Sequence, residues 1–212
     1  MNQKTPSSRR NFIKKSAIAT GSLMAVAQVN WANPLAAARS TENLNIIGPK
    51  EGFTPQVGTL VSMMDFMRDI VLRSVRNLKV KELDFLLDKK SNSIGGMLLH
   101  LAAVERFYQG NTFDGKKWDK LTAKESHLWD AAGDLGDKGR SDIKGYSLDF
   151  YLNVLEEVRA FSIAEMKKRD DDWIMHEDHF WGGPMNNYAK WFHVVEHESN
   201  HNGQIKYIKS RF

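Results

Sequence analysis

The chain contains no cysteine among its 212 residues. This absence excludes a thiolate nucleophile, cysteine-ligated zinc, iron–sulfur clusters and a cysteine-linked lipoprotein anchor. Proline is scarce, at five residues, and 42% of the residues are hydrophobic while 26% are charged. These proportions exclude collagen, low-complexity disorder and disulfide scaffolds, and the length suits one domain with a short appendage.

The body of the chain also lacks an excess of positive charge. The formal net charge is +4, but residues 1–38 hold five basic residues and no acidic one. The remaining 25 basic residues face 26 acidic ones, which gives a net charge of −1. The basic character therefore belongs to the leader, and nucleic acid is not an expected partner.

Residues 1–38 have the order of segments that is typical of a signal peptide. A basic start is followed by a weakly apolar stretch over 16–32 and by small residues up to Ala38, after which we expect cleavage. Arg9 and Arg10 resemble the paired arginines of twin-arginine export signals. The resemblance implies export of a folded protein, with the twin-arginine machinery as a partner and a periplasmic or otherwise exported location. An uncleaved amphipathic or membrane anchor is the alternative.

The body, residues 39–212, is expected to be helical throughout. Apolar residues recur at three- and four-residue spacing, and no β-branched run alternates at period two over a useful length. Four long helices are predicted, over about 54–78, 91–108, 147–168 and from 186 to the C-terminus. Short helical pieces are expected near 81–87 and 121–132, and Phe180–Pro184 is expected to be a sharp stop. The pattern predicts an all-α fold, a four-helix bundle with an insertion between the second and third long helices.

Three of the seven histidines recur at four-residue intervals on the last helix: His193, His197 and His201. Residues four apart on a helix lie about 6 Å from each other, so two imidazoles can bind one ion. His193 and His201 are about 12 Å apart along the axis, so all three cannot. Spacing leaves open whether the pair is His193 with His197 or His197 with His201. A third ligand is expected from another helix, and His100 is the best candidate because it lies mid-helix among apolar residues.

Other readings of these histidines remain. His100 can be a buried histidine bonded to a carbonyl, and the spaced histidines can be a polar stripe, although both together in an otherwise apolar bundle favour a metal site. His127 is expected in the solvent-facing insertion. His176 and His179 are expected in a solvated polar loop.

No general base is named from the sequence, so the catalytic residues are unknown. Glu105 lies about 140° round the helix from His100 and is expected to face away. Glu196 and Glu198 flank His197 and are also expected off the inward direction. Asp65 lies at the edge of the apolar face of the first helix, where a surface ion pair is its alternative role.

Several segments together resemble the DinB/YfiT-like family. The segment from His197 to Ile205 is similar to the family's C-terminal signature, which is His-x3-His followed by x-Gly-Gln and an aliphatic residue. Ile94–Glu105 resembles the histidine segment of its second helix. The resemblance spans about 53–208, and one departure is Asn202, where many relatives carry a basic residue.

The resemblance implies a four-helix bundle with a metal triad of His100, His197 and His201, and it leaves His193 beside the site. The ion is expected to be zinc or nickel, with iron or manganese as alternatives. The expected function is an exported metal-dependent hydrolase that activates a bound water for an unknown small-molecule substrate. The alternative within the family is a thiol-dependent transferase or isomerase. Because the chain has no cysteine, the thiol of such a reaction would be a cosubstrate.

Two rival functions come from other classes. A non-catalytic metal-binding bundle predicts a closed coordination shell and stability that collapses on chelation. A metal-free interaction bundle needs an exposed aromatic patch, which Trp118, Trp129, Trp173 and Trp181 could supply. A homodimer is left open.

Overall fold

A computed structural model describes residues 43–212, and the expected signal peptide lies outside these residues. The described part holds eight helices and one two-stranded sheet: α3 (Pro55–Val75), α4 (Val80–Leu83), α5 (Ile94–Thr112), α6 (His127–Asp134), α7 (Gly136–Asp142), α8 (Leu148–Met166), α9 (Asp171–Met175), β1 (Glu177–Phe180), β2 (Gly183–Asn186) and α10 (Asn187–Lys209). Within this range, no helix combines the length and the apolar character that crossing a membrane requires.

The four long helices begin where the sequence supplies a start signal. Pro55 occupies the first turn of α3, where its missing N–H costs nothing. The side chains of Ser93, Ser147 and Asn186 each accept a hydrogen bond from the backbone N–H three residues further on, at the starts of α5, α8 and α10. These N-caps satisfy backbone donors that have no partner within the helix.

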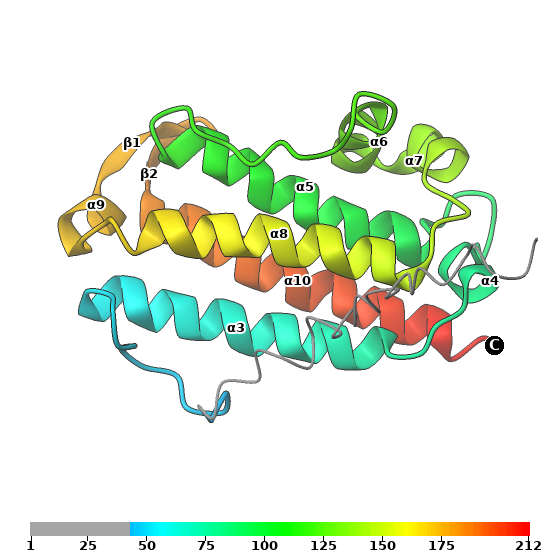
Figure 1. Cartoon of the computed structure of the whole chain (residues 1–212), viewed down its shortest axis with the longest axis horizontal. Helices are drawn as coiled ribbons and strands as arrows, with labels where there is room; N and C mark the ends of the chain where they lie inside the picture. The colour runs from blue at the N-terminus through cyan, green and yellow to red at the C-terminus, as the bar shows by residue number, and fades with distance from the viewer. Residues whose placement is uncertain (1–42) are drawn as a thin grey trace, which may run out of the picture. The chain divides into compact units, whose positions relative to one another are not determined.

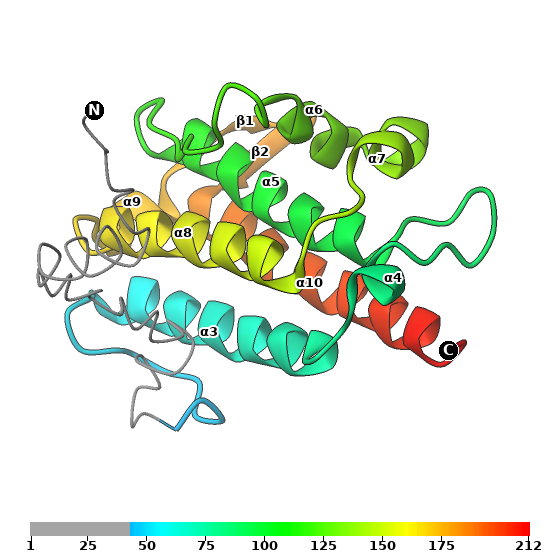
Figure 2. The same ribbon diagram turned by 45° about the vertical axis from the view of Figure 1, so that its right-hand side comes forward.

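The long helices α3, α5, α8 and α10 lie side by side (Figures 1 and 2). Helix α10 packs against α3 and α5, and α8 packs against α5. The insertion helix α6 packs on α5, while α9 and the hairpin contact α10. The described part is mostly helical, as expected for an all-α protein.

The apolar core forms two clusters with a charged layer between them. One cluster includes Val71, Leu98, Leu155 and Ile205, and the other includes Leu60, Tyr108, Met166 and Trp191, all buried. Along each long helix, the residue between its two apolar stretches is buried and charged: Arg68, Glu105, Arg159 and Glu198. The expectation of an otherwise apolar interior is therefore wrong.

The segment after α9 is a β-hairpin, which the sequence analysis did not predict. Glu177 pairs with Asn186 and Phe180 with Gly183 in an antiparallel register. The turn expected there is present, at Trp181 and Gly182, and both residues have positive φ, 50° and 84°. This is the geometry of a two-residue hairpin turn, whose twist matches that of the strands. His179 therefore lies in a strand, not in a loop.

The shorter helices also differ from expectation. The piece expected near 81–87 is a single turn, α4, and the piece expected near 121–132 begins only at His127. Helices α7 and α9 were not predicted. Both are shorter than two full turns, so neither shows enough periodicity to be recognised.

Candidate metal centre

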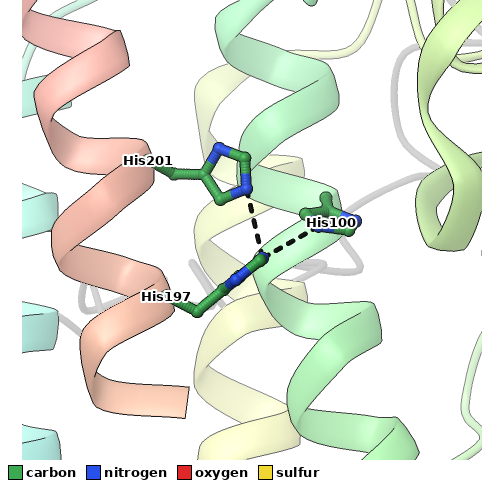
Figure 3. A group of neighbouring side chains, drawn as sticks. All are labelled: His100, His197 and His201. Carbon is green, nitrogen blue, oxygen red and sulfur yellow. Dashed lines mark hydrogen bonds between the residues drawn. The ribbon is translucent and has the colours of Figure 1, made fainter. Parts of the chain in front are cut away.

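Helices α5 and α10 bring three histidines together. His100 lies on the second turn of α5, and His197 and His201 lie one turn apart on α10 (Figure 3). The Nε2 atom of His197 lies 2.9 Å from that of His100 and 3.1 Å from that of His201. These three residues, the His triad, form a group whose ligand atoms all lie within 4.8 Å of one another.

The outward-facing nitrogens of two of these rings are held by the protein. His100 Nδ1–H donates to the carbonyl oxygen of Ala132, the sixth residue of α6, at 2.6 Å. His201 Nδ1 lies 3.2 Å from Oε1 of Gln204, an amide oxygen that can only accept. In a neutral imidazole only one nitrogen carries a proton, so Nε2 of both rings is a bare lone pair aimed at the centre. Such outer partners orient histidine ligands in metal sites.

The environment keeps the triad neutral at physiological pH. Burial, together with the smaller effects of the nearby His201 and His100, lowers the pKa of His197 to about 3. Burial and His100 also lower the pKa of His201 to about 4. Burial lowers the pKa of His100, although the bond to the Ala132 carbonyl partly opposes this. Neutral imidazole is the form that ligates a metal.

The arrangement fits a divalent cation. His197 can donate an Nε2 proton to only one of its two neighbours, so at least one close pair of Nε2 atoms has no shared hydrogen. A cation at the centre would use all three lone pairs. Imidazole nitrogens bound to zinc at tetrahedral angles lie about 3.3 Å apart, so the observed spacing needs only a small expansion. An all-nitrogen set suits zinc or nickel, with iron as an alternative.

The remaining sequence candidates lie outside the triad. His193 forms a second group with Glu196 and His197, and its Nδ1 lies 2.6 Å from Oε1 of Glu196. His193 therefore lies beside His197 and outside the triad. Asp65 forms a partly buried ion pair with Lys50, at 2.7 Å, and is not part of the triad.

The histidines expected at the surface are exposed. The Nδ1 atom of His127 bonds to the Lys124 carbonyl at the start of α6. His176 and His179 are solvent-exposed beside the hairpin. None of the three belongs to the groups of potential ligands found among the described residues.

A buried ion-pair network that was not predicted from the sequence includes Glu198, the residue after His197. Arg68 Nη2 lies 2.7 Å from Oε1 of Glu198 and 2.9 Å from Oε2 of Glu105. Arg159 Nε lies 2.9 Å from Glu105 Oε1, and its Nη2 lies 2.8 Å from Glu198 Oε1. The expectation that Glu198 is off the inward direction is wrong: only 1% of it is exposed. Glu105 faces away from the triad as expected, but into the core.

A signal for this network was present in the sequence. Arg68 follows Met64 by four residues and Glu198 follows Val194 by four, so each charged residue lies on the apolar face of its own helix. A charge placed there is buried, and buried charges are paired. Each of the four charged residues of the network could have been found in the sequence as a charged position on the apolar face of a long helix.

Comparison with known proteins identifies a family for this chain. A family model described as Mycothiol-S-transferase matches residues 59–212, a range that contains the whole His triad. A search among curated proteins finds no match. Since the family match covers more than half of the sequence, the chain belongs to the mycothiol S-transferase family, within the DinB/YfiT-like superfamily.

Proposed function

We propose that this protein is a metal-dependent S-transferase, which joins a low-molecular-weight thiol of the mycothiol type to an electrophilic carbon. The observation that carries the proposal is the convergence of three neutral imidazole nitrogens from α5 and α10. The family match supports the choice of reaction.

A divalent ion held by the His triad would lower the pKa of a coordinated thiol, as it does for a coordinated water. The chain contributes orientation and desolvation: the Ala132 carbonyl and Gln204 fix two of the rings. The thiol loses its proton to solvent, a sulfur–carbon bond forms, and the leaving group departs with its electron pair. Because the chain contains no cysteine, the thiol is a cosubstrate.

Hydrolysis, which the sequence analysis preferred, has no support from the family match. The match favours the alternative, transfer of a thiol. The fold proposed for the four long helices is the DinB-like four-helix bundle. The preferred ion is zinc or nickel.

The test is a conjugation assay on metal-loaded protein. Mycothiol and 1-chloro-2,4-dinitrobenzene are the substrates, glutathione is the thiol control, and 4-nitrophenyl acetate reports hydrolysis. We expect conjugation with mycothiol, a loss of about 100-fold or more in His197→Ala, and no loss in the surface control His127→Ala. Metal-dependent ester hydrolysis without conjugation would support the hydrolase instead. Neither activity, together with bound metal, would support the non-catalytic bundle.

We also propose that residues 1–38 direct export. The proposal rests on Arg9, Arg10 and the order of segments in the sequence. Replacing both arginines with lysine should leave the protein in the cytoplasm of a bacterial host, as measured by cell fractionation. Equal export of the two proteins would contradict a twin-arginine signal.

A further inference from the structure

A small pocket borders His193, one helical turn on the N-terminal side of His197. Its volume is about 240 Å³. Its walls come from four elements: α5, the end of α6, the hairpin turn and α10. The lining includes the rings of Phe107, Tyr108, Trp181 and His193, with Gly133 and Asp134 at the α6 side. We call this space the aromatic pocket.

The rings around the aromatic pocket meet mostly edge to face. Trp181 and His193 have ring centroids 5.1 Å apart with an interplanar angle of 82°. Tyr108 lies 5.9 Å from His193 at 78° and 6.5 Å from Trp181 at 67°. Edge-to-face neighbours leave ring faces available, and a planar ring gains most from such faces and edges.

Trp181 occupies a turn position at which other residue types are preferred. A two-residue hairpin turn with positive φ at both positions prefers Asn, Asp or Gly at the first. A tryptophan at φ 50° costs about 1–2 kcal/mol relative to glycine there. The ring is nevertheless 64% exposed, so burial does not repay this cost. A strained residue of this kind indicates a functional constraint.

The hairpin that carries Trp181 is anchored to α10. Lys190 is fully buried, and its Nζ lies 2.7 Å from a carboxylate oxygen of Asp178 on β1. The same Nζ lies 5.1 Å from the ring centroid of Phe180. These contacts hold the turn in place beside the aromatic pocket.

The ring of His193 lies between the aromatic pocket and His197, a member of the His triad. The ring of His193 lies 5.0 Å from that of His197, centroid to centroid. A group in the pocket would therefore lie beside any reaction at the triad. The volume is below the range of about 300–1,000 Å³ for drug-sized ligands, so the pocket suits one ring rather than a whole cosubstrate.

On the C-terminal side of His197, the triad has hydrogen-bonding side chains nearby. A second pocket, of about 520 Å³, adjoins His201 through Gln204, and its lining mixes the polar Lys90, Asn92, Asn200 and Gln204 with apolar residues such as Leu87 and Ile208. Gln204 also contacts His201. Its amide and ammonium groups are donors that a hydrophilic molecule can use, and for these donors we call this space the polar pocket.

We propose that the aromatic pocket binds a planar aromatic group of the electrophilic substrate, and that the polar pocket takes the hydrophilic thiol. The assignment rests on the proposed function. It names the substrate class as an electrophile that carries an aromatic ring. Trp181 is the residue that selects it.

The test measures binding of 4-fluorobenzyl alcohol to the full chain by ¹⁹F NMR and calorimetry. Cyclohexylmethanol is the control probe, because it has an aliphatic ring in place of the aromatic one. The variant Trp181→Asn removes the ring but suits the turn, so we expect it to fold with an equal or higher melting temperature. Trp181→Phe keeps a ring, and Tyr207→Ala removes an exposed aromatic residue from the polar pocket.

We expect Trp181→Asn to weaken probe binding by about fivefold or more, and Trp181→Phe to restore most of it. Tyr207→Ala should bind as the unchanged protein does, and cyclohexylmethanol should bind more weakly. No binding, equal binding by Trp181→Asn, equal binding of cyclohexylmethanol, or weakening only in Tyr207→Ala would each overturn the proposal.

The binding test is independent of the transfer reaction. The aromatic pocket is formed by protein side chains, so the probe should bind with and without zinc. Probe binding without conjugation activity would remove the proposed function and leave the pocket. Conjugation activity together with unchanged probe binding in Trp181→Asn would support the proposed function and overturn the assignment of the aromatic pocket.

Discussion

At the scale of single residues, the protonation state of the His triad decides what the site can do. Each ring presents its Nε2 atom to the others, and burial keeps the rings neutral. The same burial makes protonation of the rings costly, because a charged imidazolium loses its hydration, and a protonated Nε2 cannot bind a metal.

This predicts the pH dependence of metal-free protein. Histidines of the unfolded chain titrate near 6.5, whereas His197 and His201 titrate at about 3 and about 4 when folded. Between pH 4 and about 6.5 the unfolded chain binds more protons than the folded protein does. The free energy of unfolding should therefore fall as the pH is lowered through this range. Urea titrations in chelator measure it. His201→Asn should reduce the slope, and a flat profile across this range would count against buried neutral rings.

Gln204 should act through His201. Removing the amide that faces His201 Nδ1 frees the ring to rotate, so Gln204→Ala should weaken zinc binding by about 10–100-fold. Zinc competition with a chromogenic chelator gives the affinity. Lys206→Ala, an exposed change on the same helix, is the control. Equal affinities in the two variants would show that the contact does not orient the ligand.

At the scale of elements, the buried ion-pair network joins all four long helices. Arg68 lies on α3, Glu105 on α5, Arg159 on α8 and Glu198 on α10. Burial alone would raise the pKa of Glu105, but the charges of Arg159 and Arg68 hold it below its ordinary value. Glu198 directly follows His197, so the network also fixes the rotation of α10 that presents the triad.

Breaking the network should be costly. Glu105→Ala leaves Arg68 and Arg159 without one of their carboxylates, and losing one partner of a buried pair costs about 3–5 kcal/mol. The exposed pair of Asp69 and Arg73 is the control, since Asp69→Ala should cost less than about 1 kcal/mol. Urea unfolding measures both. Similar costs would mean that the network contributes no more than a surface pair.

The elements differ in how well the sequence predicts them. The long helices were predicted to within a few residues, because apolar periodicity over about 20 residues and clear N-caps act together. The hairpin was missed because Glu177–Phe180 does not alternate between apolar and polar residues. It is held instead by the contact between Lys190 and Asp178, a tertiary interaction that no local pattern contains.

At the scale of the whole molecule, the site depends on long-range placement. Spacing alone left two histidine pairs open, and only the resemblance pointed to His197 with His201. The structure brings His100 to that pair and leaves His193 on the side of the aromatic pocket. The two pockets could not be predicted, since each combines residues from segments far apart in the chain.

The proposals on export and on the thiol cosubstrate make opposite demands. Mycothiol-type thiols belong to the reducing side of the cell, whereas an exported enzyme works outside it. Cell fractionation and the conjugation assay together decide whether both proposals hold for one protein.

Binding of a divalent metal by the His triad is the central claim, and metal content by mass spectrometry tests it most directly. Protein lacking residues 1–38 is compared with His201→Ala and with the surface control His127→Ala. We expect about one ion per chain in the unchanged protein and the control, and loss of the ion in His201→Ala. A protein that stays empty after incubation with zinc, nickel or manganese would contradict the account.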